Sequence, residues 1–231
     1  MRPESRFVRA LWAPVNLLQF AFTLGWSAFW ISVALLARLV TPRAARARVT
    51  RFVARRIWAA GLLVGAGARL RVVGLDRLPP GGTHLFVANH SSWIDIAALY
   101  RALPIDPHFV AKRELGRVPF LGRFLRTMGM VLVDRSNLRR ATDAVHAATA
   151  LLAAGRSVVS FPEGTRSRDG HLAPFKSAGF GAALAAGCDV VPVALVGAGA
   201  VLPAGGFRVR PGTIEVRFGT PIPVADCAAT P

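Results

Sequence analysis

The feature that most restricts the fold of this 231-residue chain is a long stretch without charge. Residues 10–37 read ALWAPVNLLQFAFTLGWSAFWISVALLA and contain no Asp, Glu, Lys or Arg over 28 positions. A helix of about 20 apolar residues crosses the hydrocarbon core of a bilayer, so this stretch is long enough to span one. A secretory signal has an apolar core of only about 7–15 residues. We therefore expect a long apolar helix near the N-terminus.

One face of that expected helix carries polar side chains. Four polar residues recur at spacings of three, four and four, namely Asn16, Gln19, Thr23 and Ser27. These spacings place them on a single helical face, which either packs on the rest of the protein or faces the lipid headgroups. Trp12, Trp26 and Trp30 suit the membrane–water interface, where amphipathic rings prefer to lie.

Positive charge is concentrated in the N-terminal third of the chain. The formal net charge is +17, and residues 1–71 hold twelve arginines against one acid, Glu4, for a net +11. Such a segment indicates an anionic partner, either nucleic acid or a membrane surface. Because the uncharged stretch lies within it, we expect an anionic lipid surface as the partner and no nucleic acid.

The segment RARVTRFVARRIWAAGLLVGAG at 46–67 is expected to form a second helix. Arg48, Arg51 and Arg55 share one of its faces, beside apolar residues. A basic amphipathic helix is typical of segments that lie on anionic lipid, although a merely solvated basic helix has the same pattern. Residues 1–68 are therefore predicted to be a membrane-anchoring helical pair.

From residue 69 onward, short β-rich segments alternate with helical ones. Strands are expected at 69–74, 84–88, 108–111, 130–134, 157–161, 190–196 and 213–218, and helices at 93–102, 119–127, 137–154 and 176–186. This alternation favours an α/β fold, with a mixed, largely parallel sheet flanked by helices. Residues 69–231 are predicted to be the catalytic domain. Cys188 and Cys227 match neither a disulfide framework nor a zinc pattern, which favours a reducing compartment.

Three polar clusters each follow an expected strand. They are Asn89-His90 through Asp95, KRELGRVPFLG at 112–122 and FPEGTRSRDG at 161–170. Ligand sites in α/β sheets form beyond the carboxyl ends of the strands, so the fold could bring all three clusters to one rim.

The first cluster, NHSSWID at 89–95, has the residues of a general base. A carboxylate at Asp95 can accept a ring N–H of His90, which leaves the other ring nitrogen to accept a proton. Ser92 and Asp95 also fit a capping box at the start of a helix, and that arrangement alone would explain Asp95. The two interpretations are compatible, because a carboxylate has two oxygens.

Other chemistries that use a histidine lack their sequence signatures. No G-x-S-x-G is present for a serine nucleophile, and the remaining histidines are too scattered for a metal site. Signatures of nucleotide-binding loops are also absent, because no G-x-G of the chain is followed by the third glycine of G-x-G-x-x-G and no G-K-[ST] occurs. We therefore expect the base to act on a hydroxyl of the substrate, without a metal or cofactor.

The third cluster has the groups that bind a phosphate. Loop N–H groups, the hydroxyls of Thr165 and Ser167 and the guanidinium of Arg166 suit a phosphate dianion. Glu163 either contacts the ligand or forms an internal salt bridge that orders the loop. Lys112 and Arg117 are further candidate cations, although charged loop residues are often only solvated.

These blocks together resemble the 1-acylglycerol-3-phosphate acyltransferase family of glycerolipid acyltransferases. The resemblance extends over about residues 83–197 and includes Val191-Pro192-Val193 as a fourth block. It implies that His90 is the general base and Asp95 its orienting partner. It implies substrate-binding roles for Lys112, Arg117, Glu163, Gly164, Thr165 and Arg166, and places Pro119 and Gly122 in the second block. Pro192 belongs to the block associated with the acyl donor.

The resemblance also implies a reaction and its partners. A fatty acyl group would move from acyl-CoA or acyl carrier protein to the hydroxyl of a lysophospholipid, first of all 1-acylglycerol 3-phosphate, giving phosphatidic acid. The alternatives are another acceptor, such as a lyso-ornithine lipid, or a non-catalytic lipid-binding protein. The expected location is a bacterial-type inner membrane, with the catalytic domain on the cytoplasmic face.

Overall fold

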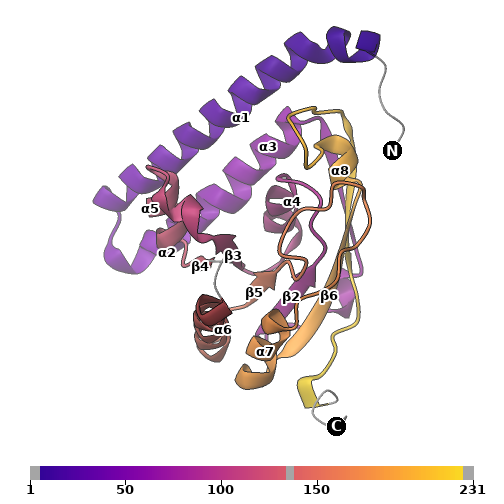
Figure 1. Cartoon of the computed structure of the whole chain (residues 1–231). Helices are drawn as coiled ribbons and strands as arrows, with labels where there is room; N and C mark the ends of the chain where they lie inside the picture. The colour runs from indigo at the N-terminus through magenta and orange to yellow at the C-terminus, as the bar shows by residue number, and fades with distance from the viewer. Residues whose placement is uncertain (1–5, 134–137, 226–231) are drawn as a thin grey trace.

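A computed structural model describes residues 6–133 and 138–225 (Figure 1). Its strands are β1 (Ala68–Val73), β2 (His84–Ala88), β3 (His108–Lys112), β4 (Val131–Val133), β5 (Val158–Ser160), β6 (Asp189–Val196) and β7 (Gly212–Phe218). They form one sheet in the order β1-β7-β6-β2-β5-β3-β4. Every neighbouring pair in it is parallel except β6 and β7, which are antiparallel. The predicted mixed, largely parallel sheet is confirmed.

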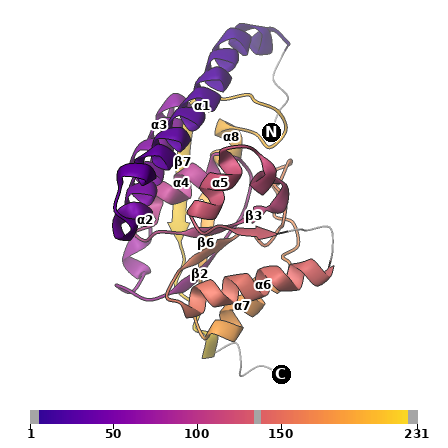
Figure 2. The ribbon, with the colours of Figure 1, turned by 90° about the vertical axis from the view of Figure 1, so that its left-hand side faces the viewer.

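Helices cover both faces of this sheet (Figure 2). They are α4 (Asp95–Ala102), α5 (Leu121–Thr127), α6 (Leu138–Ala153), α7 (Ala178–Ala186) and α8 (Ala198–Val201), with 3-10 turns η2 (Leu75–Arg77) and η3 (Arg113–Arg117). Strand β2 shows why both faces are apolar. Leu85 and Val87 pack in the core under α6 and α7, whereas Phe86 and Ala88 pack in the core under α4 and the N-terminal helices. A strand buried on both faces reads as a continuous apolar run.

The predicted elements match the structure closely, with differences at helix starts. The helix predicted from 119 begins at Leu121, because Phe120 has a φ of 58° that does not fit a helix. The helix predicted from 93 begins at Asp95, because Asp95 holds the preceding loop. Positions 134 and 137, predicted to end a strand and to begin a helix, lie outside the described residues, as do Glu4 and Cys227.

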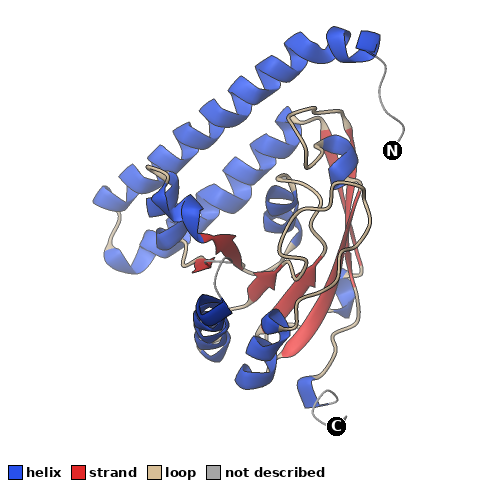
Figure 3. Ribbon diagram, in the orientation of Figure 1, coloured by secondary structure: helices blue, strands red, loops and turns tan. Residues whose placement is uncertain are grey.

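The N-terminal residues form a helical hairpin that lies along one side of the molecule (Figure 3). Helix α1 (Arg6–Val40) turns at Thr41-Pro42 into α2 (Arg43–Phe52), the π-helical turn η1 (Val53–Trp58) and α3 (Ala59–Gly65). Two glycines let α3 approach α1. A Cβ atom at Gly61 would overlap the Trp26 ring, and one at Gly65 would overlap the Phe22 ring.

The polar stripe of α1 packs on the protein, which decides between the two alternatives. Asn16 Oδ1 accepts the Val209 N–H at 2.7 Å, and Ser27 Oγ accepts the indole N–H of Trp58 at 3.1 Å. Trp26 donates its own indole N–H to the Trp58 carbonyl at 3.1 Å. The prediction that Trp26 serves as a membrane-interface anchor therefore needs correction, because its polar atom is bonded within the hairpin.

The basic face of the second helix also differs from the prediction. Arg55 donates to the carbonyls of Tyr100 and Leu103, and both Arg51 and Arg55 pair with Asp106, at 2.5 and 3.1 Å. These two arginines dock the hairpin on the end of α4 and the loop before β3 instead of facing lipid. Arg48 is exposed, as predicted.

The outer surface of α1 is apolar and exposed. Within the described residues, Ala10–Val40 is the helix that is long and apolar enough to cross a membrane, judged by length and composition only, with a mean hydropathy of 1.7. Only 11% of its most apolar window is buried inside the protein, unlike the core helix of a soluble protein.

Candidate active site

His90 and Asp95 meet directly beyond the end of β2. The His90 Nδ1 atom lies 2.8 Å from Asp95 Oδ2, and the Asp95 side chain is 0% exposed. The same Oδ2 accepts the backbone N–H groups of Ser91 and Ser92, each at 2.8 Å. Asp95 thus both orients His90 and holds the loop that begins α4. One oxygen makes all three contacts, whereas Oδ1 is buried and has no hydrogen-bond partner within residues 6–133 and 138–225.

The His90 ring is fixed by its neighbours. It stacks on Phe161 with ring centroids 4.1 Å apart, its backbone N–H donates to Glu163 Oε1 at 2.7 Å, and its carbonyl accepts the Ser167 N–H at 2.8 Å. With Nδ1–H donated to Asp95, the lone pair remains on Nε2. His90 also lines a cavity. The arrangement is that of a general base with a fixed tautomer.

Asn89 extends the sheet beyond the last residue of β2. Its amide Nδ2 donates to the Leu195 carbonyl at 3.0 Å, and its Oδ1 accepts the Leu195 N–H at 2.7 Å. The side chain thus replaces a backbone ladder pair with β6 and sets where the His90 segment leaves the sheet. The sequence placed Asn89 in the first cluster but gave it no role. An amide side chain directly after a strand could have indicated hydrogen bonding to the neighbouring strand.

Glu163 orders its loop, as one of the two interpretations of the sequence expected, but it does so through backbone groups instead of an arginine. Its side chain is buried, Oε1 accepts the His90 N–H at 2.7 Å and Oε2 accepts the Ala173 N–H at 3.0 Å. Both oxygens are therefore occupied by backbone donors. Among the described residues Glu163 forms no ion pair with an arginine, and its contact with the ligand stays a prediction. It ties the loop after β5 to the loop after β2.

Arg166 extends into the same region as His90. Its guanidinium lies 4.3 Å from the centroid of the Trp93 ring, and its Nη1 is buried without a hydrogen-bond partner in the described part of the chain. Burial lowers the pKa of the Arg166 guanidinium and nearby Asp95 opposes that shift, so the group stays cationic at neutral pH. A partly buried cation with an unused donor is suited to bind an anion.

The other predicted binding residues divide into two groups. Lys112, Gly164 and Thr165 line the same cavity as His90 and Arg166. Lys112 is exposed and lies 3.4 Å from Glu114. Arg117 is exposed at the end of η3 and does not line the cavity, so the structure does not place it at the site.

Pro119, Gly122 and Pro192 also lie away from the cavity lining. A Cβ atom at Gly122 would overlap the carbonyl of Gly116, so this glycine allows η3 and α5 to pack closely. Pro192 lies within β6, in register with Val87 of β2. These residues shape the scaffold of the site.

The cavity has a volume of about 500 Å³ and is mostly apolar. Its polar residues follow β2, β3 and β5. Its apolar lining comes from several helices and strands and includes Ile31 of α1, Trp58 of η1, Tyr100 of α4, Phe109 of β3 and Phe124 of α5. Burial raises the pKa of Tyr100, which therefore stays neutral. The pocket joins the imidazole of His90 and the guanidinium of Arg166 to a space that fits an apolar chain. No cluster of three metal-ligating side chains occurs among the described residues.

Comparisons with known proteins agree with this geometry. The family described as Acyltransferase matches residues 69–196, more than half of the chain and including every residue from His90 to Arg166. Two similar proteins are the chloroplastic 1-acyl-sn-glycerol-3-phosphate acyltransferase BAT2 of Brassica napus and the 1-acyl-sn-glycerol-3-phosphate acyltransferase of Limnanthes douglasii. The first is 36% identical over 153 residues, which are 65% of this chain and 44% of that protein. The second is 36% identical over 172 residues, 72% of this chain and 61% of that protein. The chain thus matches about half the length of these relatives.

A solved structure shares the fold. The crystal structure of the 1-acyl-sn-glycerophosphate (LPA) acyltransferase PlsC from Thermotoga maritima aligns with a TM-score of 0.78 and 24% sequence identity. The alignment covers 91% of this chain and 86% of that chain, so it includes most of the N-terminal hairpin as well as the sheet.

Proposed function

The chain belongs to the acyltransferase family, and from this premise we propose that it transfers a fatty acyl group from an acyl thioester to the hydroxyl of 1-acyl-sn-glycerol 3-phosphate, giving phosphatidic acid. One observation carries the proposal: His90, which pairs with Asp95 at 2.8 Å, lines the same cavity as the partly buried guanidinium of Arg166. The names of the relatives, which specify 1-acyl-sn-glycerol-3-phosphate acyltransferases, support this choice of acceptor.

The proposed mechanism follows from the tautomer of His90. Nε2 takes the proton of the acceptor hydroxyl as its oxygen attacks the thioester carbonyl carbon. Asp95 stabilises the imidazolium that forms, as in other histidine–carboxylate pairs. The tetrahedral intermediate then collapses, the carbon–sulfur bond breaks, and the departing sulfur receives the proton from His90. The thioester is a co-substrate, and these steps use no cofactor.

The remaining groups of the cavity bind the rest of the substrates. Arg166 supplies two parallel N–H donors to a phosphate, a geometry that an ammonium cannot reproduce. Thr165 adds a hydroxyl, and Lys112 is near enough to add a charge. The apolar part of the cavity receives an acyl chain, whose burial is favourable by about 0.8 kcal/mol per CH₂.

We also propose that α1 lies in a membrane and brings the site to headgroup depth. The acceptor is a single-chain lipid, while a soluble acyl-CoA or acyl carrier protein would arrive from the cytoplasmic side of a bacterial-type inner membrane. The exposed apolar surface of α1 supports this arrangement.

The test is an assay of the full chain with an acyl thioester, with and without lysolipid, and with His90→Ala as the inactive control. Turnover that requires lysolipid supports the proposal. Thioester hydrolysis without lysolipid would mean a hydrolase, and binding without turnover would mean a lipid-binding protein.

Two panels of substrates in the same assay identify the acyl acceptor and the acyl donor. We expect lysophosphatidate to be used in preference to lysophosphatidylcholine and lyso-ornithine lipid, because Arg166 suits a phosphate monoester. A preference for lyso-ornithine lipid would replace the proposed acceptor. Acyl-CoA and acyl carrier protein thioesters are compared at a fixed acceptor.

A further inference from the structure

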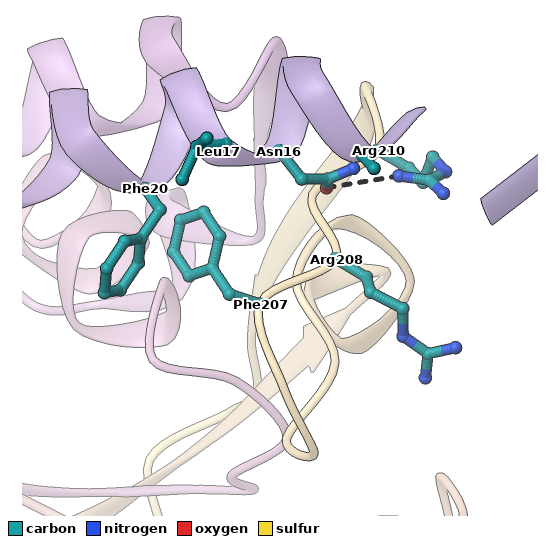
Figure 4. A pocket seen from close by; sticks show the side chains of 7 residues that line it. Asn16, Leu17, Phe20, Phe207, Arg208 and Arg210 are labelled. Atoms are coloured by element: carbon teal, nitrogen blue, oxygen red, sulfur yellow. Dashed lines mark hydrogen bonds between the residues drawn. The ribbon is translucent and has the colours of Figure 1, made fainter. Parts of the chain in front are cut away.

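A second groove lies where α1 crosses the segment 203–211 that joins α8 to β7 (Figure 4). It has a volume of about 360 Å³. Helix α1 contributes Ala13, Asn16, Leu17 and Phe20, and the segment contributes Phe207, Arg208 and Arg210. None of these residues lines the catalytic cavity. The groove is therefore separate from the site proposed for the reaction.

Polar and aromatic contacts fix the groove in place. Asn16 Oδ1 accepts both the Val209 N–H at 2.7 Å and an N–H of Arg210 at 3.3 Å. The Arg210 guanidinium also lies 4.5 Å from the centroid of the Trp12 ring. The rings of Phe20 and Phe207 meet edge to face with centroids 5.0 Å apart. The segment is thus held on α1 through Phe207, Val209 and Arg210.

The rim of the groove is cationic. Residues 197–211 contain two arginines and no Asp or Glu. Arg210 is engaged with α1, whereas Arg208 is exposed and makes no hydrogen bond or ion pair within the described ranges. In Figure 4 its guanidinium extends away from the Phe207 ring. Arg208 therefore offers its donors to a ligand at the edge of the groove.

The floor of the groove continues into the apolar surface of α1. Leu17 is 68% exposed and Phe20 is 43% exposed, and their neighbours Leu18, Phe22 and Leu24 are exposed as well. A soluble anion would contact the guanidinium but leave this apolar surface in water. A membrane phospholipid has an anionic phosphate joined to apolar chains, so it matches both parts of the groove.

We propose that this groove binds one anionic membrane phospholipid, with its phosphate at Arg208 and an acyl chain along Leu17 and Phe20. This inference rests on the proposed location of α1 in a membrane. The bound lipid is not a substrate, because the groove shares no residue with the catalytic cavity. It fixes the depth and rotation of the N-terminal half of α1, since the 203–211 segment links that half to β7.

The experiment measures binding of the full chain to vesicles of phosphatidylcholine, with or without phosphatidylglycerol. Arg208→Gln should lower affinity for the anionic vesicles about five-fold, because one basic residue near such a surface contributes about 1 kcal/mol. Affinity for neutral vesicles should not change, and Arg208→Lys should restore most of the loss. The matched control is Arg156→Gln, which removes the same charge from an exposed position between α6 and β5. An equal loss in Arg156→Gln would mean general attraction, and would overturn the site.

Photo-crosslinking locates the lipid directly. Phosphatidylglycerol with a photoreactive group near the head of its acyl chain should label peptides that contain Leu17 or Phe207 in wild type, and much less in Arg208→Gln. Labelling elsewhere would overturn the inference. The proposed function is tested separately, by measuring lysolipid-dependent turnover in detergent micelles. If the wild-type chain turns over lysolipid but binds anionic and neutral vesicles equally, the lipid site in the groove is refuted and the proposed function stands. If the wild-type chain binds neither kind of vesicle, the membrane location of α1 is refuted.

Discussion

The guanidinium of Arg166 lies over the indole ring of Trp93, 4.3 Å from the ring centroid. The two residues come from different strand ends, since Trp93 follows β2 and Arg166 follows β5. Trp93 is otherwise largely exposed. A large exposed ring under a partly buried cation has a specific effect: it holds the guanidinium plane in one orientation. A guanidinium donates two parallel hydrogen bonds to a phosphate only when its plane is correctly oriented.

Replacing Trp93 should therefore weaken acceptor binding. An exposed cation–π contact is worth about 0.5–1 kcal/mol, so Trp93→Leu should raise the KM for lysophosphatidate about two- to five-fold. Trp93→Phe should be milder, because a ring remains. The KM for the thioester serves as the internal control and should not change. A loss confined to kcat would indicate that Trp93 acts on His90 and not on Arg166.

The catalytic pair should behave as one unit. His90→Ala should lower kcat at least about 100-fold, the lower end for loss of general-base catalysis. Asp95→Asn should act on the same step and be strongly non-additive with His90→Ala. It should also lower Tm, because Asp95 Oδ2 holds the N–H groups of Ser91 and Ser92. Full activity of Asp95→Asn with only a lower Tm would leave Asp95 as a helix cap alone.

The sequence was sufficient to predict the sheet and the contact between His90 and Asp95, for physical reasons. Strands such as β2 and β6 are buried on both faces and read as apolar runs, and the spacing of His90 and Asp95 fits one turn between a strand and a helix. The loop-ordering role of Glu163 was expected from the sequence, but the groups that it binds were not. Its partners are the backbone N–H groups of His90 and Ala173, and backbone groups leave no trace in the sequence.

The arginines of the second helix were misassigned for a related reason. Helical periodicity shows that Arg51 and Arg55 share a face, but it does not show what that face meets. Their partner Asp106 lies about fifty residues away, in the loop before β3, and only the fold brings it to the hairpin. Trp93 and Trp58 were missed at the site because an aromatic residue near a motif is equally typical of core packing.

The packing of α1 on α3 should be sensitive to single methyl groups. A Cβ at Gly61 would overlap the Trp26 ring, whereas Gly25 of α1 has no atom within 4 Å of its Cβ position. Overpacking typically costs about 1–3 kcal/mol, so Gly61→Ala should lower Tm in detergent. Gly25→Ala, the matched control, should keep or raise Tm, because alanine favours helix. Equal effects of the two changes would show that α1 does not pack on α3 as described.

Stability should fall in mild acid, in part through His108. Burial lowers the pKa of His108 below its ordinary value of 6.5, with Arg156 and Arg51 adding to the effect, while the Ser157 carbonyl and Asp106 oppose it. A histidine with a lowered pKa in the folded state binds its proton more readily when unfolded. The contribution of neutral His108 to the free energy of unfolding is therefore complete above pH 6.5. It is lost as the pH falls below 6.5, and the free energy of unfolding then decreases by at most about 1.4 kcal/mol per pH unit. Denaturant unfolding of His108→Gln between neutral pH and pH 5 should show a smaller loss than wild type; an identical loss would exclude His108 as the cause.

The last prediction concerns the docking of the N-terminal hairpin. Arg55 and Arg48 lie on the same helical face, so a change at Arg48 is the control for a change at Arg55. Arg55 donates to the carbonyls of Tyr100 and Leu103 and pairs with Asp106, whereas Arg48 is exposed. Arg55→Gln should leave two carbonyls without a charged donor and remove one of the two arginines that pair with Asp106, and hydrogen bonds to charged groups are worth about 1.5–3 kcal/mol each. We expect a clear fall in Tm, and a loss of activity in vesicles and micelles alike, because Trp58 and Ile31 of the hairpin line the catalytic cavity. Arg48→Gln removes the same charge and should change neither quantity in micelles. Activity lost only on anionic vesicles, and equally in both variants, would restore the view that this face meets lipid.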